Sequence, residues 1–161
     1  MAKTAQDIME KKVITAAPDT SIFTLVDTFV EDNVNAIPVV NEDNEILGII
    51  TDADVLYKEV KPNVPQYINL LGANIYYGNL KKYEQGFKKL FACTAKELMT
   101  KKVIMAGPDA TIEDLASVMV AEHLKAIPIV KDKKLLGLVE RKNILRELYH
   151  EYGDDSPKQT K

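Results

Sequence analysis

The chain has 161 residues, of which 46% are hydrophobic and 28% charged, with 21 basic against 24 acidic side chains. This composition is typical of a soluble globular protein, and its apolar runs are too short to span a membrane. The formal net charge of −3 favours neither nucleic acid nor an anionic membrane as a partner. The single cysteine, Cys93, excludes an internal disulfide and a multi-cysteine zinc site. Because the first residues lack the apolar segment of a secretory signal, we expect a cytoplasmic location.

The first predicted element is a short helix that begins after Thr4. Thr4 and Asp7 have the spacing of a capping box, in which a hydroxyl and a carboxylate satisfy the free amides of a helix start. Val13 and Ile14 indicate a short strand, and Pro18 then interrupts the chain before an amphipathic helix. The apolar positions of that helix recur at helical spacing, at Ile22, Leu25, Val26, Phe29 and Val30.

Two strands and another helix follow. Residues 36–40 and 45–51 are rich in β-branched side chains and flank a polar turn at 42–44, which predicts a pair of strands. Asp52 is a favourable helix N-cap, so we expect a helix to begin near it. Residues 1–60 are therefore expected to form one β-α-β-β-α unit.

Residues 61–93 form an insert that is too apolar for a flexible linker. Its second half predicts an amphipathic helix, with apolar side chains at Leu80, Tyr83, Phe87, Leu90 and Phe91. This helix would pack on its own domain, form a dimer contact or close over a ligand cleft, and the sequence leaves these alternatives open.

The chain then repeats itself. Residues 94–130 align with residues 4–40, and 17 of the 37 aligned positions are identical. A second unit is therefore expected at 94–152, followed by a polar, disordered tail at 153–161. Because one unit buries too little apolar area to be stable alone, we predict an α/β (α+β) fold in which both pack sheet to sheet. The residues expected in the shared interior are Val13, Ile14, Val39, Ile49 and their counterparts.

This repeated order of elements resembles a pair of cystathionine-β-synthase (CBS) domains, a tandem also called a Bateman module. The resemblance is carried by Ile8-Met9, Pro18-Asp19, the strand at 36–40 and the segment Gly48 to Asp54, each with a counterpart in the second unit. It implies a regulatory, non-enzymatic module that commonly forms a homodimer. It also implies an adenosine-containing ligand, such as AMP, ADP, ATP or S-adenosylmethionine, bound in the cleft between the repeats.

The ligand motif of this family is matched in the first repeat by Gly48, Thr51 and Asp54. The resemblance implies that the Asp54 carboxylate accepts hydrogen bonds from the ribose hydroxyls, and charged acceptors of this kind are strong. Thr51 would hold a ribose or phosphate oxygen at the start of the helix. Asp52 would repel phosphate unless its side chain caps the helix or turns away. Candidate walls for the purine are Ile14, Thr15, Ala16, Ile37 and Pro38.

The second repeat departs from this motif, because Glu140 replaces the hydroxyl residue and Asn143 replaces the aspartate. A neutral amide binds a diol more weakly than a carboxylate does, so any second site is expected to be weaker. The residues of such a weaker site would be Asn143, Ile127, Pro128 and Ile104. The second repeat would instead supply positive charge to the first site, from Arg141, Lys142, His123 or Lys125. The equally good alternative is that these four residues form an ordinary charged surface, in which Arg141 pairs with Glu140 or Glu147.

Two functions remain open from the sequence. The first is a regulatory module that senses an adenosyl ligand and signals through a partner protein, which the sequence does not identify, or through the geometry of a dimer. The second is a structural or oligomerising module whose nucleotide site is vestigial. An enzyme is not indicated, because His123 and His150 are the only histidines and neither has the spacing of a metal site or a catalytic triad. No catalytic residue, catalytic cofactor or metal is therefore assigned.

Overall fold

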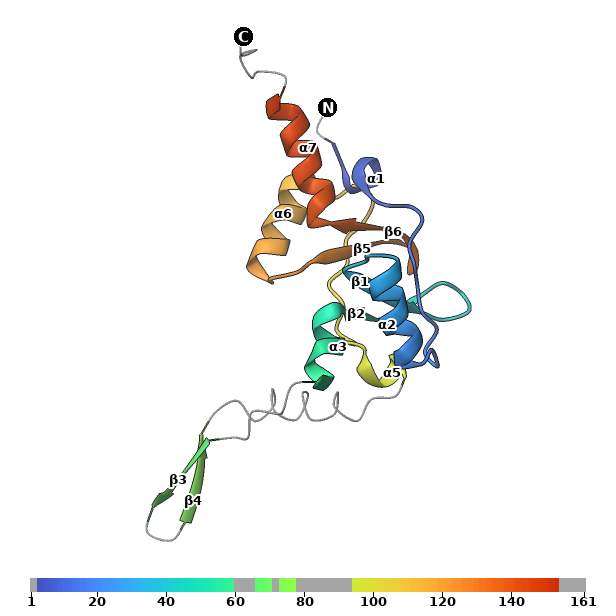
Figure 1. Cartoon of the computed structure of the whole chain (residues 1–161). Helices are drawn as coiled ribbons and strands as arrows, with labels where there is room; N and C mark the ends of the chain where they lie inside the picture. The colour runs from blue at the N-terminus through green and yellow to red at the C-terminus, as the bar shows by residue number, and fades with distance from the viewer. Residues whose placement is uncertain (1–2, 60–65, 71–72, 78–93, 154–161) are drawn as a thin grey trace, which may run out of the picture.

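The computed structural model describes residues 3–59, 66–70, 73–77 and 94–153 (Figure 1). The elements in chain order are α1 (Ala5–Ile8), α2 (Ile22–Glu31), β1 (Ala36–Val40), β2 (Ile46–Thr51), α3 (Asp52–Glu59), β3 (Gln66–Leu70), β4 (Ala73–Tyr77), α5 (Ala95–Leu98), α6 (Ile112–Ala121), β5 (Ala126–Lys131), β6 (Lys134–Glu140) and α7 (Arg141–Gly153). In the described part of the chain, no helix is both long and apolar enough to cross a membrane.

Each repeat is built on one antiparallel hairpin, β1 with β2 and β5 with β6, flanked by helices. The predicted α+β fold is therefore confirmed, and the two strands of the first repeat begin and end within a residue of their expected bounds. Alternating burial is weak because β1 and β5 are buried on both faces, which suits their continuous apolar sequence. These hairpins place the β2–α3 and β6–α7 junctions at equivalent ends of the two repeats.

The strand expected at Val13-Ile14 does not form. Instead, Ala16 alone makes a parallel bridge to Val39, with the Ala16 amide donating to the Pro38 carbonyl at 3.0 Å. Proline at position 18 lacks an amide hydrogen, so it ends any ladder soon after Ala16. Ala106 makes the equivalent bridge to Ile129 in the second repeat. Each predicted first strand is thus reduced to a single bridged residue.

The first helix of each sequence repeat packs on the other repeat. The Ala5 amide in α1 donates to the carbonyl of Ala110 at 2.8 Å, and Glu10 bridges Leu138 in β6. Ala5 is completely buried in the core of the second repeat, beside Leu115 of α6. The N-terminal segment of the chain therefore completes the second repeat, as Figure 1 shows by the position of α1 beside α7.

The reciprocal exchange is made by α5. Its Ala95 amide donates to the Thr20 carbonyl at 2.8 Å, and Thr100 exchanges two backbone hydrogen bonds with Ile49 of β2. Leu98 is completely buried in the core of the first repeat, and Figure 1 shows α5 beside α2. The first helix of each sequence repeat is thus buried in the core of the other repeat. This exchange joins the two repeats into one unit.

The motif glycines lie at these exchange contacts. A Cβ atom built on Gly48 would lie 2.7 Å from Cγ of Met99 and closer still to its sulfur. A Cβ atom built on Gly137 would lie 2.5 Å from the sulfur of Met9 and 3.0 Å from the Glu10 carbonyl oxygen. Each glycine therefore makes room for a methionine that the other sequence repeat contributes.

A small apolar cluster joins the repeats. It consists of buried Ala36, Ala126 and Leu138, with half-buried Val13 and Ile49 packed against it. Val13 and Ile49 thus lie between the repeats as predicted. The predictions for two other residues were wrong: Val39 is fully buried but belongs to the core of the first repeat, and Ile14 is 37% exposed.

The insert contains a hairpin that its sequence pattern did not predict. β3 and β4 pair antiparallel, with Ile68 opposite Ile75, and form a separate two-stranded sheet. The predicted amphipathic helix at residues 80–91 and most of the predicted disordered tail at 153–161 lie outside the described residues.

Candidate functional site

The site begins where β2 ends and α3 starts. The backbone amide of Thr51 donates to Oδ2 of Asp54 at 2.8 Å, and the Thr51 hydroxyl donates to the same oxygen at 3.2 Å. Thr4 and Asp7 make the same pair of contacts at the start of α1. In this structure Thr51 and Asp54 therefore cap α3, and both side chains are half-buried.

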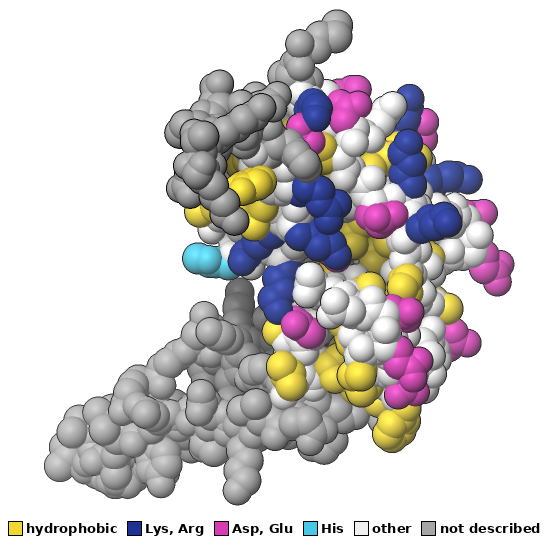
Figure 2. All heavy atoms as spheres, turned by 45° about the horizontal axis from the view of Figure 1, so that its top comes forward, with side chains coloured by type: hydrophobic (Ala, Val, Ile, Leu, Met, Phe, Trp, Pro, Cys, Tyr) yellow, Lys and Arg dark blue, Asp and Glu magenta, His cyan; other side chains and the backbone are white. Residues whose placement is uncertain are grey.

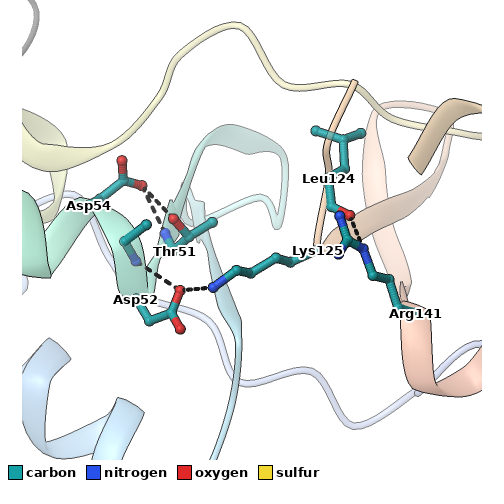
Figure 3. A network of polar contacts seen from close by, with 7 residues as sticks. Thr51, Asp52, Asp54, Leu124, Lys125 and Arg141 are labelled. Carbon is teal, nitrogen blue, oxygen red and sulfur yellow. Dashed lines mark hydrogen bonds and ion pairs between the residues drawn. The ribbon is translucent and has the colours of Figure 1, made fainter. Parts of the chain in front are cut away.

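Asp52 points to the other side of the helix start and reaches the second repeat. Its Oδ1 atom accepts the Ala53 amide at 2.8 Å and lies 2.5 Å from Nζ of Lys125, a residue 73 positions later. The two charged side chains are 39% and 41% exposed. As Figure 3 shows, this ion pair spans from α3 of the first repeat to the segment that enters β5 of the second.

Arg141 lies beside Lys125 on the same side of the site (Figure 3). Its Nε–H donates to the Leu124 carbonyl at 2.7 Å, and its backbone amide donates to the Lys125 carbonyl at 3.3 Å. These bonds fix the position of Lys125 relative to the start of α7. The acidic residues considered as partners of Arg141 are engaged elsewhere: Glu140 pairs with Lys142 at 2.5 Å, and Glu147 pairs with Lys3.

Figure 2 shows lysine and arginine side chains gathered near the centre of one face of the molecule. At the β2–α3 junction, the basic side chains come from the second repeat and the carboxylates of Asp52 and Asp54 come from the first. The junction therefore brings acceptors for hydroxyl groups from the first repeat together with cationic donors from the second. Among residues 3–56 and 94–149, no three side chains of the histidine, cysteine or acidic type gather into a metal site.

The equivalent junction of the second repeat differs in charge. Glu140 stands at the position of Thr51 and is only 5% exposed, while its backbone amide donates to Oδ1 of Asn143 at 2.7 Å. Asn143 thus keeps the capping role of Asp54 without its charge. A buried carboxylate, held by Lys142, occupies the place where the first repeat has a hydroxyl.

The predicted purine walls divide into exposed and buried residues. Ile14 and Thr15 are exposed on the segment that crosses between the repeats, whereas Ala16, Ile37 and Pro38 are buried. Ile37 packs in the core of the first repeat. In the second repeat Ile127 and Pro128 are buried in the same way, and Ile104 is half-buried. The exposed residues of the first repeat are therefore the ones that can meet a ligand with their side chains in this conformation.

Sequence reasoning placed Thr51 and Asp54 together but did not predict the partner of Asp52. The spacing Thr-x-x-Asp carries the signal for the cap, since the same spacing was interpreted as a capping box at Thr4 and Asp7. No local pattern connects Asp52 to Lys125, because their contact depends on how the two repeats pack.

Comparison with known proteins identifies the family. A family model for the CBS domain matches the chain twice, at residues 5–61 and 95–150. The chain belongs to the CBS-domain family. These two matches confirm the tandem pair that the sequence repeat predicted.

Relatives of this CBS pair occur both as proteins of similar length and as parts of longer ones. Protein MJ1426 of Methanocaldococcus jannaschii is 29% identical over 151 residues, which is 89% of each chain. The inosine-5'-monophosphate dehydrogenase of the same organism is 27% identical over 145 residues, but the match covers only 23% of that enzyme. A CBS pair similar to this one is thus a minor part of some larger proteins.

Solved structures share the fold closely. CBSX2 in complex with AMP has a TM-score of 0.76 at 21% identity, and the match covers 92% of this chain and 97% of that chain. The CBS domain pair of protein MJ0100, in complex with 5'-methylthioadenosine and S-adenosyl-L-methionine, has a TM-score of 0.65 at 25% identity, covering 91% and 99%. Both structures carry adenosine-containing ligands, with and without a phosphate.

Proposed function

We propose that this CBS pair is a regulatory module that binds one adenosine-containing ligand at the β2–α3 junction of the first repeat. The observation that carries the proposal is the arrangement at this junction, where Thr51 and Asp54 of the first repeat lie opposite Lys125 and Arg141 of the second. The AMP, 5'-methylthioadenosine and S-adenosyl-L-methionine complexes of CBS pairs with the same fold support this class of ligand.

Asp54 is the residue we assign to the ribose. Its capping contacts with Thr51 use the oxygen Oδ2. A carboxylate can accept several hydrogen bonds at once, so the capping contacts do not exclude hydrogen bonds from the ribose hydroxyls. The exposed Ile14 and Thr15, on the segment that crosses between the repeats, would contact the base. Lys125 and Arg141 would face the 5' substituent of the ribose.

The exchange of α1 and α5 supplies a route from ligand to output. A ligand held between the repeats contacts residues of both, so it binds more tightly to the relative position of the repeats that fits it and shifts the chain toward that position. Regulation then follows from this difference in affinity, and the output passes to a partner protein or to a homodimer. We infer regulation because the site joins hydrogen-bonding groups of the first repeat to cations of the second, so that a bound ligand reports on the relative position of the repeats.

A structural or oligomerising module is the second candidate. It is favoured by the capping contacts, since they give Thr51 and Asp54 a role that needs no ligand. It is also favoured by two apolar side chains on α2 that point away from the core. Phe23 is 79% exposed and Val30 is 75% exposed. This candidate predicts a homodimer in sedimentation equilibrium that is lost in Phe23→Glu, together with no response to any adenosine compound.

A thermal-shift screen with the Asp54→Asn variant tests the two candidates. Asparagine keeps an oxygen that can accept the Thr51 amide, so this variant removes the charge and retains the cap of α3, whereas Asp54→Ala would also remove the hydrogen bonds to Thr51. A ligand present at a hundredfold excess over its dissociation constant stabilises the native state by about 2.7 kcal/mol. We expect adenosine, AMP, ATP or S-adenosylmethionine, but not GTP, to raise the melting temperature.

The matched control is Asn143→Ala at the equivalent position of the second repeat. We expect the selective shift to be strongly reduced in Asp54→Asn and to persist in Asn143→Ala. Equal losses in both variants would contradict the assignment of the site to the first repeat. If none of these compounds shifts the wild-type protein, after copurified ligand has been excluded by mass spectrometry, the structural module becomes the better account.

A further inference from the structure

Asp52 already accepts hydrogen bonds from the two donors that a phosphate at this site would use. Its carboxylate accepts the Ala53 amide at the start of α3 and pairs with the Lys125 ammonium at 2.5 Å. A helix N-terminal amide and a lysine ammonium are common donors to a bound phosphate. In this structure both donors are therefore satisfied by an anion that belongs to the chain itself.

The two cations at the start of α7 are also engaged. Lys142 is paired with the buried carboxylate of Glu140 at 2.5 Å. Arg141 lies beside Lys125, with its Nε–H committed to the Leu124 carbonyl. A phosphate on the 5' side of a bound ribose that pairs with Lys125 must therefore displace Asp52, and it then lies beside the negative charge of Asp52.

We propose that Asp52 is a built-in competitor for the ligand phosphate and sets the preference of the site between phosphorylated and unphosphorylated adenosyl ligands. This inference rests on the proposed function, because it concerns the same site. Adenosine or a thioether nucleoside leaves the pair between Asp52 and Lys125 intact. A nucleoside phosphate has to exchange with Asp52 and so releases the contact that joins α3 to the second repeat.

The exposure of the pair allows this exchange. Asp52 and Lys125 are 39% and 41% exposed, so a ligand can reach both side chains without unfolding the junction. An ion pair of this exposure contributes little to stability, because water already screens it. The phosphate dianion carries more charge than the carboxylate that it replaces, so it attracts Lys125 more strongly. The displaced Asp52 carboxylate repels the phosphate and so opposes the exchange.

Calorimetric titration with two probes, adenosine and AMP, tests the proposal in four proteins. These are the wild type, Asp52→Asn, Lys125→Gln and the control Asp43→Asn, which removes the same charge from the exposed turn between β1 and β2. We expect Asp52→Asn to bind AMP at least about fivefold more tightly than the wild type, with adenosine affinity changed less than about twofold. Lys125→Gln should weaken AMP alone, and Asp43→Asn should change neither.

The outcomes separate this inference from the proposed function. Asparagine can still accept the Ala53 amide, and circular dichroism of Asp52→Asn and Lys125→Gln checks that each variant is folded. Suppose that the wild type binds adenosine. If Asp52→Asn then gains no affinity for AMP, or gains equal affinity for both probes, the competitor role of Asp52 is wrong while the proposed function stands. If neither adenosine nor AMP binds to any of the four proteins, both the proposed function and this inference are wrong.

Discussion

Gly48 and Gly137 occupy the same position in the two motifs, and each lies against a methionine of the other sequence repeat. The resemblance to CBS domains places this glycine in the ligand motif, next to the residues assigned to the ribose. The structure gives it a packing role, because a side chain there would collide with Met99 or Met9. The glycine therefore has a role in the exchange of helices that needs no ligand.

Alanine at either glycine should destabilise the protein. Because a Cβ atom would overlap the methionine side chain, we expect Gly48→Ala and Gly137→Ala each to lower the free energy of unfolding by about 1–3 kcal/mol, measured by urea denaturation. Gly107→Ala is the control, since a Cβ atom there has nothing within 4 Å. Equal unfolding free energies of all three variants would show that the close contacts with the methionines do not affect stability.

Asp7 makes the start of α1 sensitive to acid. The hydrogen bonds from the Thr4 amide and the Thr4 hydroxyl lower the pKa of the Asp7 carboxyl below its ordinary value. A pKa that is lower in the folded state means stability that is present above the ordinary pKa and is lost as the pH falls through the folded value. The cap of α1 is therefore complete near neutral pH and lost in acid.

Comparison of the wild type with Asp7→Asn measures this effect. We expect the wild type to be the more stable protein at pH 7, and the difference in unfolding free energy to shrink as the pH falls below about 4. Urea denaturation at a series of pH values provides the measurement. A difference that stays constant across this range would exclude the charge of Asp7 as the cause.

At the scale of elements, the helices and the central hairpins were predictable because their signals are local. The spacing of Ile22 and Leu25 predicted α2, and both residues are buried as that pattern requires. The strand expected at Val13 was wrong because β-branched residues favour a strand only where a partner lies alongside, and here the segment crosses between repeats. The β3–β4 hairpin was missed because its short apolar runs do not distinguish strand from helix.

The exchange of α1 and α5 predicts that core mutations act on the distant repeat. Leu98 belongs to the second sequence repeat but is buried in the core of the first, so Leu98→Ala should cost about 2–5 kcal/mol. We expect hydrogen exchange to lose protection first in β1 and β2. The matched variant Ile8→Ala, in α1, should instead affect β5 and β6. Loss of protection confined to each residue's own sequence repeat would contradict the exchange.

At the scale of the whole molecule, the two repeats carry opposite charges where their turns meet. Asn44 and Leu135 exchange hydrogen bonds of 3.0 Å between the β1–β2 turn and the start of β6. The first turn carries Glu42 and Asp43, and the second carries Lys131, Lys133 and Lys134 with one acidic residue, Asp132. Opposite charges favour the pairing of the first repeat with the second over the pairing of two like repeats.

The candidate site was predictable only in part, because some of its contacts are local in the sequence and others join the two repeats. Thr51 and Asp54 lie within one helical turn, so their spacing in the sequence already places them together. The contact between Asp52 and Lys125 depends on the packing of two repeats, which no local pattern specifies. The burial of Ile37 and Pro38 likewise follows from the position of β1 inside its repeat.

The most direct test of the account is to map AMP binding by two-dimensional NMR of the backbone amides of the full chain. We expect the largest shifts to cluster at Thr51, Ala53 and Asp54, with a second group at Lys125 and Arg141, and to saturate at one AMP per chain. Shifts centred on the β6–α7 junction, or no saturable shifts at the β2–α3 junction, would contradict it.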